Sequence, residues 1–193
     1  MNIIGLIGHK CSGKDTTADF LVTKGYTKIS FADNLRNCLK ILFNWDSKIF
    51  TQDNKEKNDK VWDVSPRLMM QLLGTEFIRN MCSPLLNNFI EFNNKRKEFS
   101  YHIKKLYLDY YDLFNKEGSK IVIADVRFPD EVEFIKWIGG TIIKVNRDTE
   151  ENEYSNHESE KNIDKIKDVD IQLDNDRTIQ HLYKKISILI LED

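Results

Sequence analysis

The segment Gly8–Lys14 constrains this chain more than any other part of it. It reads Gly-His-Lys-Cys-Ser-Gly-Lys, which matches the pattern G-x-x-x-x-G-K, and it follows the apolar run Ile3–Ile7. A short apolar run that ends at glycine predicts a buried strand. The next stretch, Lys14–Lys24, carries spaced apolar residues and stops at Gly25, which predicts a helix.

A glycine-rich loop between a strand and a helix has a specific use. The glycines let successive backbone N–H groups turn inward, and the N-terminus of the helix adds positive potential. The segment is therefore predicted to bind phosphate. We expect Lys14 to reach the β- and γ-phosphates of ATP, and the other ATP contacts to come from Gly8, Cys11, Ser12 and Gly13.

The residues after the loop lysine depart from the usual pattern, which places Ser or Thr there to hold magnesium. Here Asp15 follows Lys14, and Thr16 comes next. A triphosphate would repel an unscreened carboxylate, so Asp15 is expected to face a cation, a water or a group of a second substrate. Thr16 is expected to donate to an α- or β-phosphate. The Lys-x-Thr arrangement resembles nucleoside monophosphate kinases more than GTPase switches, and the chain has no N-K-x-D segment to read guanine.

Apolar runs and helical spacing alternate along the rest of the chain, which predicts a parallel α/β sheet with right-handed crossovers. The fold class is therefore α/β, a three-layer P-loop fold with a five-stranded parallel sheet, a helical insertion and a flap. Further strands are expected at 27–30, 120–124, 141–145 and 169–173. Helices are expected after Asp33 and Asp176 as caps, from Pro66, over 85–115 and over 130–138, with an irregular stretch at 44–64 and an exposed flap at 148–162.

Charged residues follow two of the predicted strands. Asp125 and Arg127 come directly after the aliphatic strand 120–124, and Asp33 and Arg36 come after the strand 27–30. Ligands of open α/β sheets bind at the carboxyl ends of the strands. Asp125, with Asp15, is therefore predicted to face Mg²⁺ through water, and Arg127 to clamp a phosphate with its planar fork.

The composition of the chain argues against some classes of function. The 193 residues include 29 basic and 31 acidic side chains, a net charge of -2, which argues against a nucleic-acid or membrane-surface role. No apolar run approaches the roughly 18 residues of a membrane helix. The cysteines Cys11, Cys38 and Cys82 form no pair pattern, so reduced thiols and a cytoplasmic location are expected.

Several motifs in order resemble those of viral deoxynucleoside monophosphate kinases. They are the Gly-Lys-Asp-Thr end of the loop, Ser30–Arg36, Leu72–Glu76 with Arg79, Asp125–Glu131 and His157–Glu160. The resemblance implies transfer of the ATP γ-phosphoryl group to a deoxynucleoside monophosphate such as dGMP, dTMP or a modified dCMP, in the host cytoplasm if the protein is viral. Whether the protein forms a homodimer stays open.

The resemblance also implies an acceptor site. Arg67 would bind phosphate and Gln71 a base edge, and Lys10 would lie between the donor and acceptor phosphates. The remaining acceptor residues would be Asp33, Arg36, Arg79, Arg127 and Glu131, whereas Arg147 would contact ATP. Catalysis would involve Lys14, Asp15, Asp125 and Arg127.

Residues 1–193 are expected to form one kinase domain, with an acceptor-binding insertion at about 44–115 and a lid at about 147–163. Two other readings stay open at this point. One is another small P-loop kinase, of the dephospho-coenzyme A or phosphomevalonate type. The other is a nucleotide-dependent switch without an acceptor, which would have no need of a second phosphate clamp.

Overall fold

The computed structural model describes residues 2–147 and 158–191. The chain divides into two compact units. The sheet unit comprises Met1–Ser30 and Asp109–Asp193, and the inserted unit comprises Phe31–Leu108. The predicted lid lies mostly outside the described residues; what is described of it is Arg147, which is exposed, and the start of a helix at Glu158.

The sheet unit is built on five parallel strands, as predicted from the apolar runs. Their order is β2-β5-β1-β6-β7, and each neighbouring pair is parallel. The central strand β1 pairs with β5 on one side and β6 on the other, so the loop that follows β1 lies at the middle of the carboxyl edge. The strands are β1 (Asn2–Ile7), β2 (Thr27–Ile29), β5 (Lys120–Ile123), β6 (Thr141–Asn146) and β7 (Ile171–Asp174).

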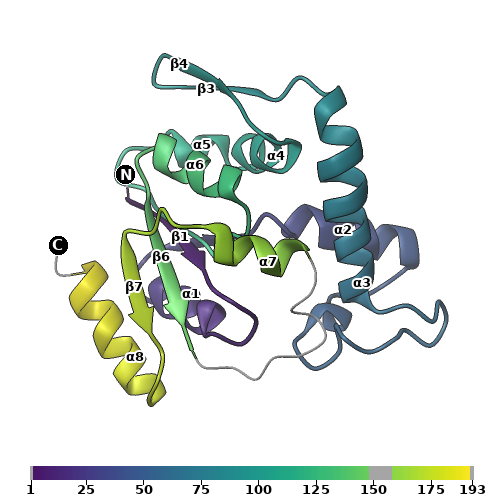
Figure 1. The fold of residues 1–193 in the computed structure, drawn as a ribbon, viewed down its shortest axis with the longest axis horizontal. Helices are drawn as coiled ribbons and strands as arrows, with labels where there is room; N and C mark the ends of the chain where they lie inside the picture. Colours follow the sequence, from purple (N-terminus) through teal and green to yellow (C-terminus); the bar gives the residue numbers. More distant parts are fainter. Residues whose placement is uncertain (1, 148–157, 192–193) are drawn as a thin grey trace. The chain divides into compact units, whose positions relative to one another are not determined.

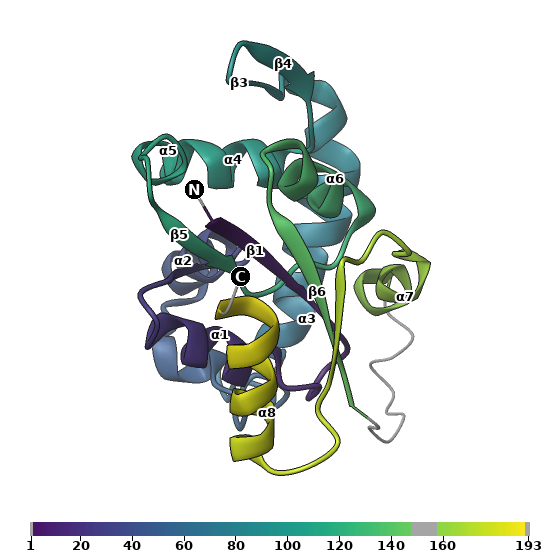
Figure 2. The same ribbon diagram turned by 90° about the vertical axis from the view of Figure 1, so that its left-hand side faces the viewer.

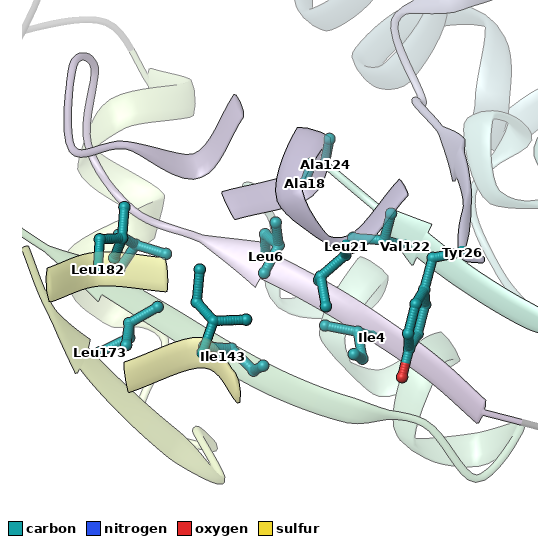
Figure 3. Packing of buried hydrophobic residues seen from close by; sticks show 12 residues of the cluster. Ile4, Leu6, Ala18, Leu21, Tyr26, Val122, Ala124, Ile143, Leu173 and Leu182 are labelled. Carbon is teal, nitrogen blue, oxygen red and sulfur yellow. The ribbon is translucent and has the colours of Figure 1, made fainter. Parts of the chain in front are cut away.

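Helices cover both faces of this sheet (Figures 1 and 2). On one face, α1 (Lys14–Val22) and α8 (Ile179–Ile186) pack on alternate residues of the strands, including Ile4, Leu6 and Ile143 (Figure 3). On the other face, α6 (Pro129–Trp137) lies so close to β1 that a Cβ on Gly5 would meet Ile135 Cδ1 at 2.6 Å. These layers confirm the predicted three-layer α/β architecture. The remaining elements of the unit are α5 (Tyr111–Phe114), α7 (Glu158–Lys165) and the π-helical end Ser187–Leu191.

The inserted unit is mainly helical. Its longest helical stretch begins at Pro66, as predicted, because proline fits the first helical position and the Ser65 side chain accepts a hydrogen bond from the Leu68 N–H. This helix, α3 (Pro66–Gln71), continues in wider π-helical turns over Leu72–Cys82. The other elements are α2 (Asp33–Phe43), the 3₁₀ turns Ser47–Phe50 and Ser83–Leu85, β3 (Phe89–Phe92), β4 (Lys95–Glu98) and α4 (Tyr101–Asp109).

The prediction of continuous helix over 85–115 is wrong. Strands β3 and β4 form an antiparallel hairpin there, in which Phe92 pairs with Lys95. The turn residues Asn93 and Asn94 have φ values of 49° and 61°, the left-handed conformation that a tight hairpin turn requires and that asparagine tolerates. The alternation of exposed and buried residues along β3 is that of a strand.

Two predicted helix caps are also wrong. Asp33 is the first residue of α2 rather than its cap, and the cap position is Ala32. Asp176 does not cap α8: the Thr178 side chain accepts from the His181 N–H instead. Helix α8 buries Leu182 and Ile186, whereas Ile179 at its start is 47% exposed. Among the described residues, no helix has the length and apolar character to cross a bilayer.

Candidate active site

The loop between β1 and α1 has the backbone that its glycines predict. Gly13 has a φ of 104°, and a Cβ there would lie 2.5 Å from Asn175 Nδ2. A Cβ on Gly8 would lie 2.5 Å from the Val145 carbonyl oxygen. Any side chain at either position would therefore force the loop apart. Cys11 also has a positive φ, of 64°, and its side chain is exposed.

Lys14 lies within this loop rather than on its surface. The residue is only 9% exposed, and its Nζ donates to the carbonyl oxygens of Gly8 at 2.5 Å and His9 at 2.6 Å. The Ser12 hydroxyl is buried and has no hydrogen-bond partner among the described residues. A held ammonium group and a buried hydroxyl in a glycine loop fit the phosphates of ATP.

Asp125 lies at the end of the strand, as predicted, two residues after the last residue of β5. Its Oδ2 accepts a hydrogen bond from the Ser30 hydroxyl at 2.6 Å, and Ser30 follows β2. The next residue, Val126, donates its N–H to the Leu6 carbonyl oxygen of β1 at 3.2 Å. Asp125 and the glycine loop thus share the carboxyl edge of adjacent strands. A carboxylate there suits Mg²⁺ that keeps most of its waters.

Arg127 and Glu131 are linked through the backbone at the start of α6. Glu131 Oε2 accepts from the N–H of Arg127 at 2.8 Å and from the N–H of Phe128 at 3.2 Å. Glu131 is 3% exposed. Its carboxylate therefore holds the Arg127–Phe128 backbone, a contact that the sequence analysis did not anticipate. An acceptor contact of Glu131 stays a prediction.

Asp15 faces a cation, and that cation is a lysine of the protein. Lys28 Nζ lies 3.2 Å from Asp15 Oδ1 and 2.9 Å from Asp19 Oδ1. Burial of Lys28 works to lower its pKa, but hydrogen bonds and the charges of the two aspartates outweigh this and raise it. The Asp15 side chain itself is 83% exposed. Lys28 therefore supplies a charge partner for Asp15.

The predicted Mg²⁺ site has few candidate protein ligands. Among residues 2–147 and 158–191, no three or more His, Cys, Asp or Glu side chains group in a way that could hold an ion. Magnesium at a nucleotide site is usually held by one or two carboxylates together with the substrate phosphates. Asp125 meets that lower requirement. The metal contact of Asp15 and the phosphate contact of Thr16, which is half-buried in the first turn of α1, stay predictions.

The predicted acceptor residues lie mainly in the inserted unit. Arg67 is 8% exposed, and its guanidinium lies 3.5 Å from Glu56 Oε1. Arg67 and Gln71 are both on α3, one turn apart, so they share a helix face as expected. Arg36 is paired with Asp33 at 2.7 Å across one turn of α2. Glu56, in a stretch read only as irregular, was missed by the sequence analysis.

The other predicted residues are Arg79, half-buried in the π-helical turns, and Lys10, half-buried in the phosphate loop. The structure adds a contact that no motif indicates. His9 Nε2 lies 2.8 Å from Asp164 Oδ1, which joins the phosphate loop to α7. His157, which belongs to the predicted lid, lies outside the described residues.

A five-stranded parallel sheet with a lysine-bearing glycine loop after its central strand defines a P-loop nucleotide-binding fold. A family model described as "Deoxynucleotide monophosphate kinase" matches residues 42–186. The chain is 37% identical over 190 residues to an Acanthamoeba polyphaga mimivirus protein provisionally named as such a kinase, across 96% of this chain and 94% of that protein. The chain belongs to the deoxynucleotide monophosphate kinase family, and it is a nucleotide kinase.

A second curated relative agrees with this membership. The deoxynucleotide monophosphate kinase of Enterobacteria phage T4 is 28% identical over 161 residues, which cover 79% of this chain and 60% of the phage protein. Among solved structures, dephospho-CoA kinase from Campylobacter jejuni is 16% identical with a TM-score of 0.46, covering 99% of this chain and 96% of that one. A likeness that distant carries no argument about substrate.

Proposed function

We propose that this protein transfers the γ-phosphoryl group of ATP to a deoxynucleoside monophosphate of the dGMP or dTMP type and releases ADP and the deoxynucleoside diphosphate. The observation that carries the proposal is the buried Lys14 ammonium in a glycine loop, in a chain that belongs to the deoxynucleotide monophosphate kinase family. The product would serve DNA precursor synthesis.

The residues of the sheet unit have distinct roles in this proposal. The loop N–H groups and Lys14 bind the donor phosphates, and the Lys14 charge stabilises the negative charge of the phosphoryl group in transfer. Asp125, held by Ser30, would face Mg²⁺ through water. When bound, Mg²⁺ neutralises phosphate charge. Arg127 binds the acceptor phosphate with its planar guanidinium, and its backbone is held by Glu131.

The residues of the inserted unit select the acceptor. Arg67 is buried beside Glu56, so its guanidinium is held in one place. A buried arginine of this kind suits a phosphate that arrives with its own negative charge. Gln71, one turn further along α3, carries a carboxamide that can both donate to and accept from a base edge.

An ADP-release assay across substrates tests the proposal. Purified protein is given ATP with Mg²⁺ and, in separate reactions, each deoxynucleoside monophosphate, each ribonucleoside monophosphate, dephospho-coenzyme A and phosphomevalonate. Product mass identifies the phosphorylated acceptor. We expect turnover with dGMP or dTMP and loss of turnover with EDTA. Turnover with dephospho-coenzyme A or phosphomevalonate alone would replace this acceptor class, and slow ATP hydrolysis without any acceptor product would favour a switch.

A further inference from the structure

Asn175 connects the last strand of the sheet to the phosphate loop. It follows β7 directly, is half-buried, and donates its backbone N–H to the Asn146 carbonyl oxygen at 2.7 Å. Its side-chain Nδ2 donates to the Ser12 carbonyl oxygen at 2.9 Å. The backbone hydrogen bond fixes the position of Asn175 at the end of the sheet, and from this position its carboxamide reaches the loop.

The bond to the Ser12 carbonyl orients a loop N–H group. The described peptide bonds include none that are cis, so the peptide between Ser12 and Gly13 is trans. In a planar trans peptide the C=O and the following N–H point in opposite directions. When the Ser12 C=O points at Asn175, the Gly13 N–H must point away from Asn175. Phosphate-binding loops work by turning such N–H groups toward the anion.

The close approach of Asn175 depends on Gly13. A Cβ on Gly13 would lie 2.5 Å from Asn175 Nδ2, which is closer than packed atoms tolerate. The φ of 104° at Gly13 is also a conformation that residues with a side chain rarely adopt. The glycine and the asparagine therefore fit one another, and the geometry they share sets the direction of one N–H group.

We propose that Asn175 is a positioning residue for nucleotide binding: it holds the Ser12–Gly13 peptide so that the Gly13 N–H faces the donor phosphates. This inference rests on the proposed function, because it assigns Asn175 to the ATP half of that site. Asn175 acts through the loop and not through contact with the base or sugar. Loss of one neutral hydrogen bond corresponds to roughly 3- to 10-fold in affinity.

The test compares Asn175→Ala with Asn146→Ala. Asn146 is a matched control, because it lies on the neighbouring strand and its Nδ2 donates to Asp174 Oδ1 at 3.1 Å rather than to the loop. Asn175→Asp is a second variant: it keeps the shape of the side chain, but an ionised carboxylate cannot donate to a carbonyl oxygen. Calorimetry gives the affinity of each protein for Mg²⁺–ADP and for Mg²⁺–tripolyphosphate, and kinetics give KM for ATP and for the acceptor.

We expect Asn175→Ala to bind both ligands about 3- to 10-fold more weakly and Asn175→Asp at least as weakly, with KM for the acceptor unchanged. Asn146→Ala should bind like the wild type, and the Tm of Asn175→Ala should match that of the control. Unchanged affinities would overturn the inference. A loss for ADP without a loss for tripolyphosphate would overturn it too, because Asn175 would then contact the nucleoside. A wild type that binds neither ligand would overturn the proposed function itself.

Discussion

Replacement of Glu131 by glutamine tests how the start of α6 is held. The carboxylate is 3% exposed and accepts from the N–H groups of Arg127 and Phe128. Glutamine keeps the shape and one acceptor oxygen but removes the charge. A hydrogen bond to a charged group contributes about 1 kcal/mol more than a neutral one. Two such bonds, with about 0.3–1 kcal/mol from a negative charge at a helix N-terminus, give a loss of about 2–3 kcal/mol.

A loss of that size is measurable. For a chain of this length, 1 kcal/mol corresponds to about 2–4 °C, so the Tm of Glu131→Gln should fall by roughly 5–10 °C in differential scanning calorimetry. The control is Glu133→Gln, an exposed position on the same helix, which should change little. Because the backbone of Arg127 loosens, kcat/KM for the acceptor should fall while KM for ATP is retained. If the Tm of Glu131→Gln equals that of the control while acceptor turnover is lost, Glu131 contacts the acceptor and this reasoning is refuted.

Three further predictions address the loop, the clamp and pH. Lys14→Ala should lower kcat by at least about 10²-fold, and near-normal turnover would contradict the P-loop assignment. Arg127→Lys should lower kcat and kcat/KM for the acceptor together, with little change in ATP affinity. The control Arg96→Lys, on the exposed hairpin, should leave both unchanged. Lost ATP affinity with normal acceptor kinetics would mean that the two phosphate sites are reversed. Burial works to raise the pKa of Asp170, but the Ile142 N–H and Lys136 outweigh this and lower it. Its stabilisation is therefore present above the ordinary carboxyl pKa of about 4 and is lost as pH falls through the lowered value. Asp170→Asn should be less stable than the wild type to urea at pH 7, with a difference that shrinks in acid; a difference that is constant with pH would contradict the pKa direction.

The sheet and the phosphate loop could be predicted because their signals are local. The strands are short apolar runs that punctuate the chain, and Gly8 and Gly13 occupy positions where only glycine fits. Pro66 marked a helix start for a similarly local reason, since its ring fixes φ near the helical value. Asp125 followed from its place at a strand end.

The contacts that were missed join residues distant in sequence or hide in charged stretches. Asn175 follows a strand but belongs to no motif, and its partner Ser12 lies near the other end of the chain. Glu56 faces Arg67 from a polar stretch whose pattern has no period. The hairpin was read as helix because apolar residues at helical spacing further along the chain masked the alternation of Phe89–Phe92. In each case the tertiary environment, and not local preference, determines the geometry.

The position of the inserted unit in the sequence affects the order in which the sheet forms and the changes in length that the chain can accept in evolution. Among the strands that the structure describes, β2 pairs only with β5, yet the whole of Phe31–Leu108 separates the two in sequence. Closing so long a loop is slow, so β2 should join the sheet late, after the chain of the inserted unit has been made. Loop-closure entropy, however, grows only with the logarithm of length, about 0.6 kcal/mol for each doubling. The segment between these two strands can therefore lengthen or shorten at small thermodynamic cost, while the phosphate loop at β1 keeps its support.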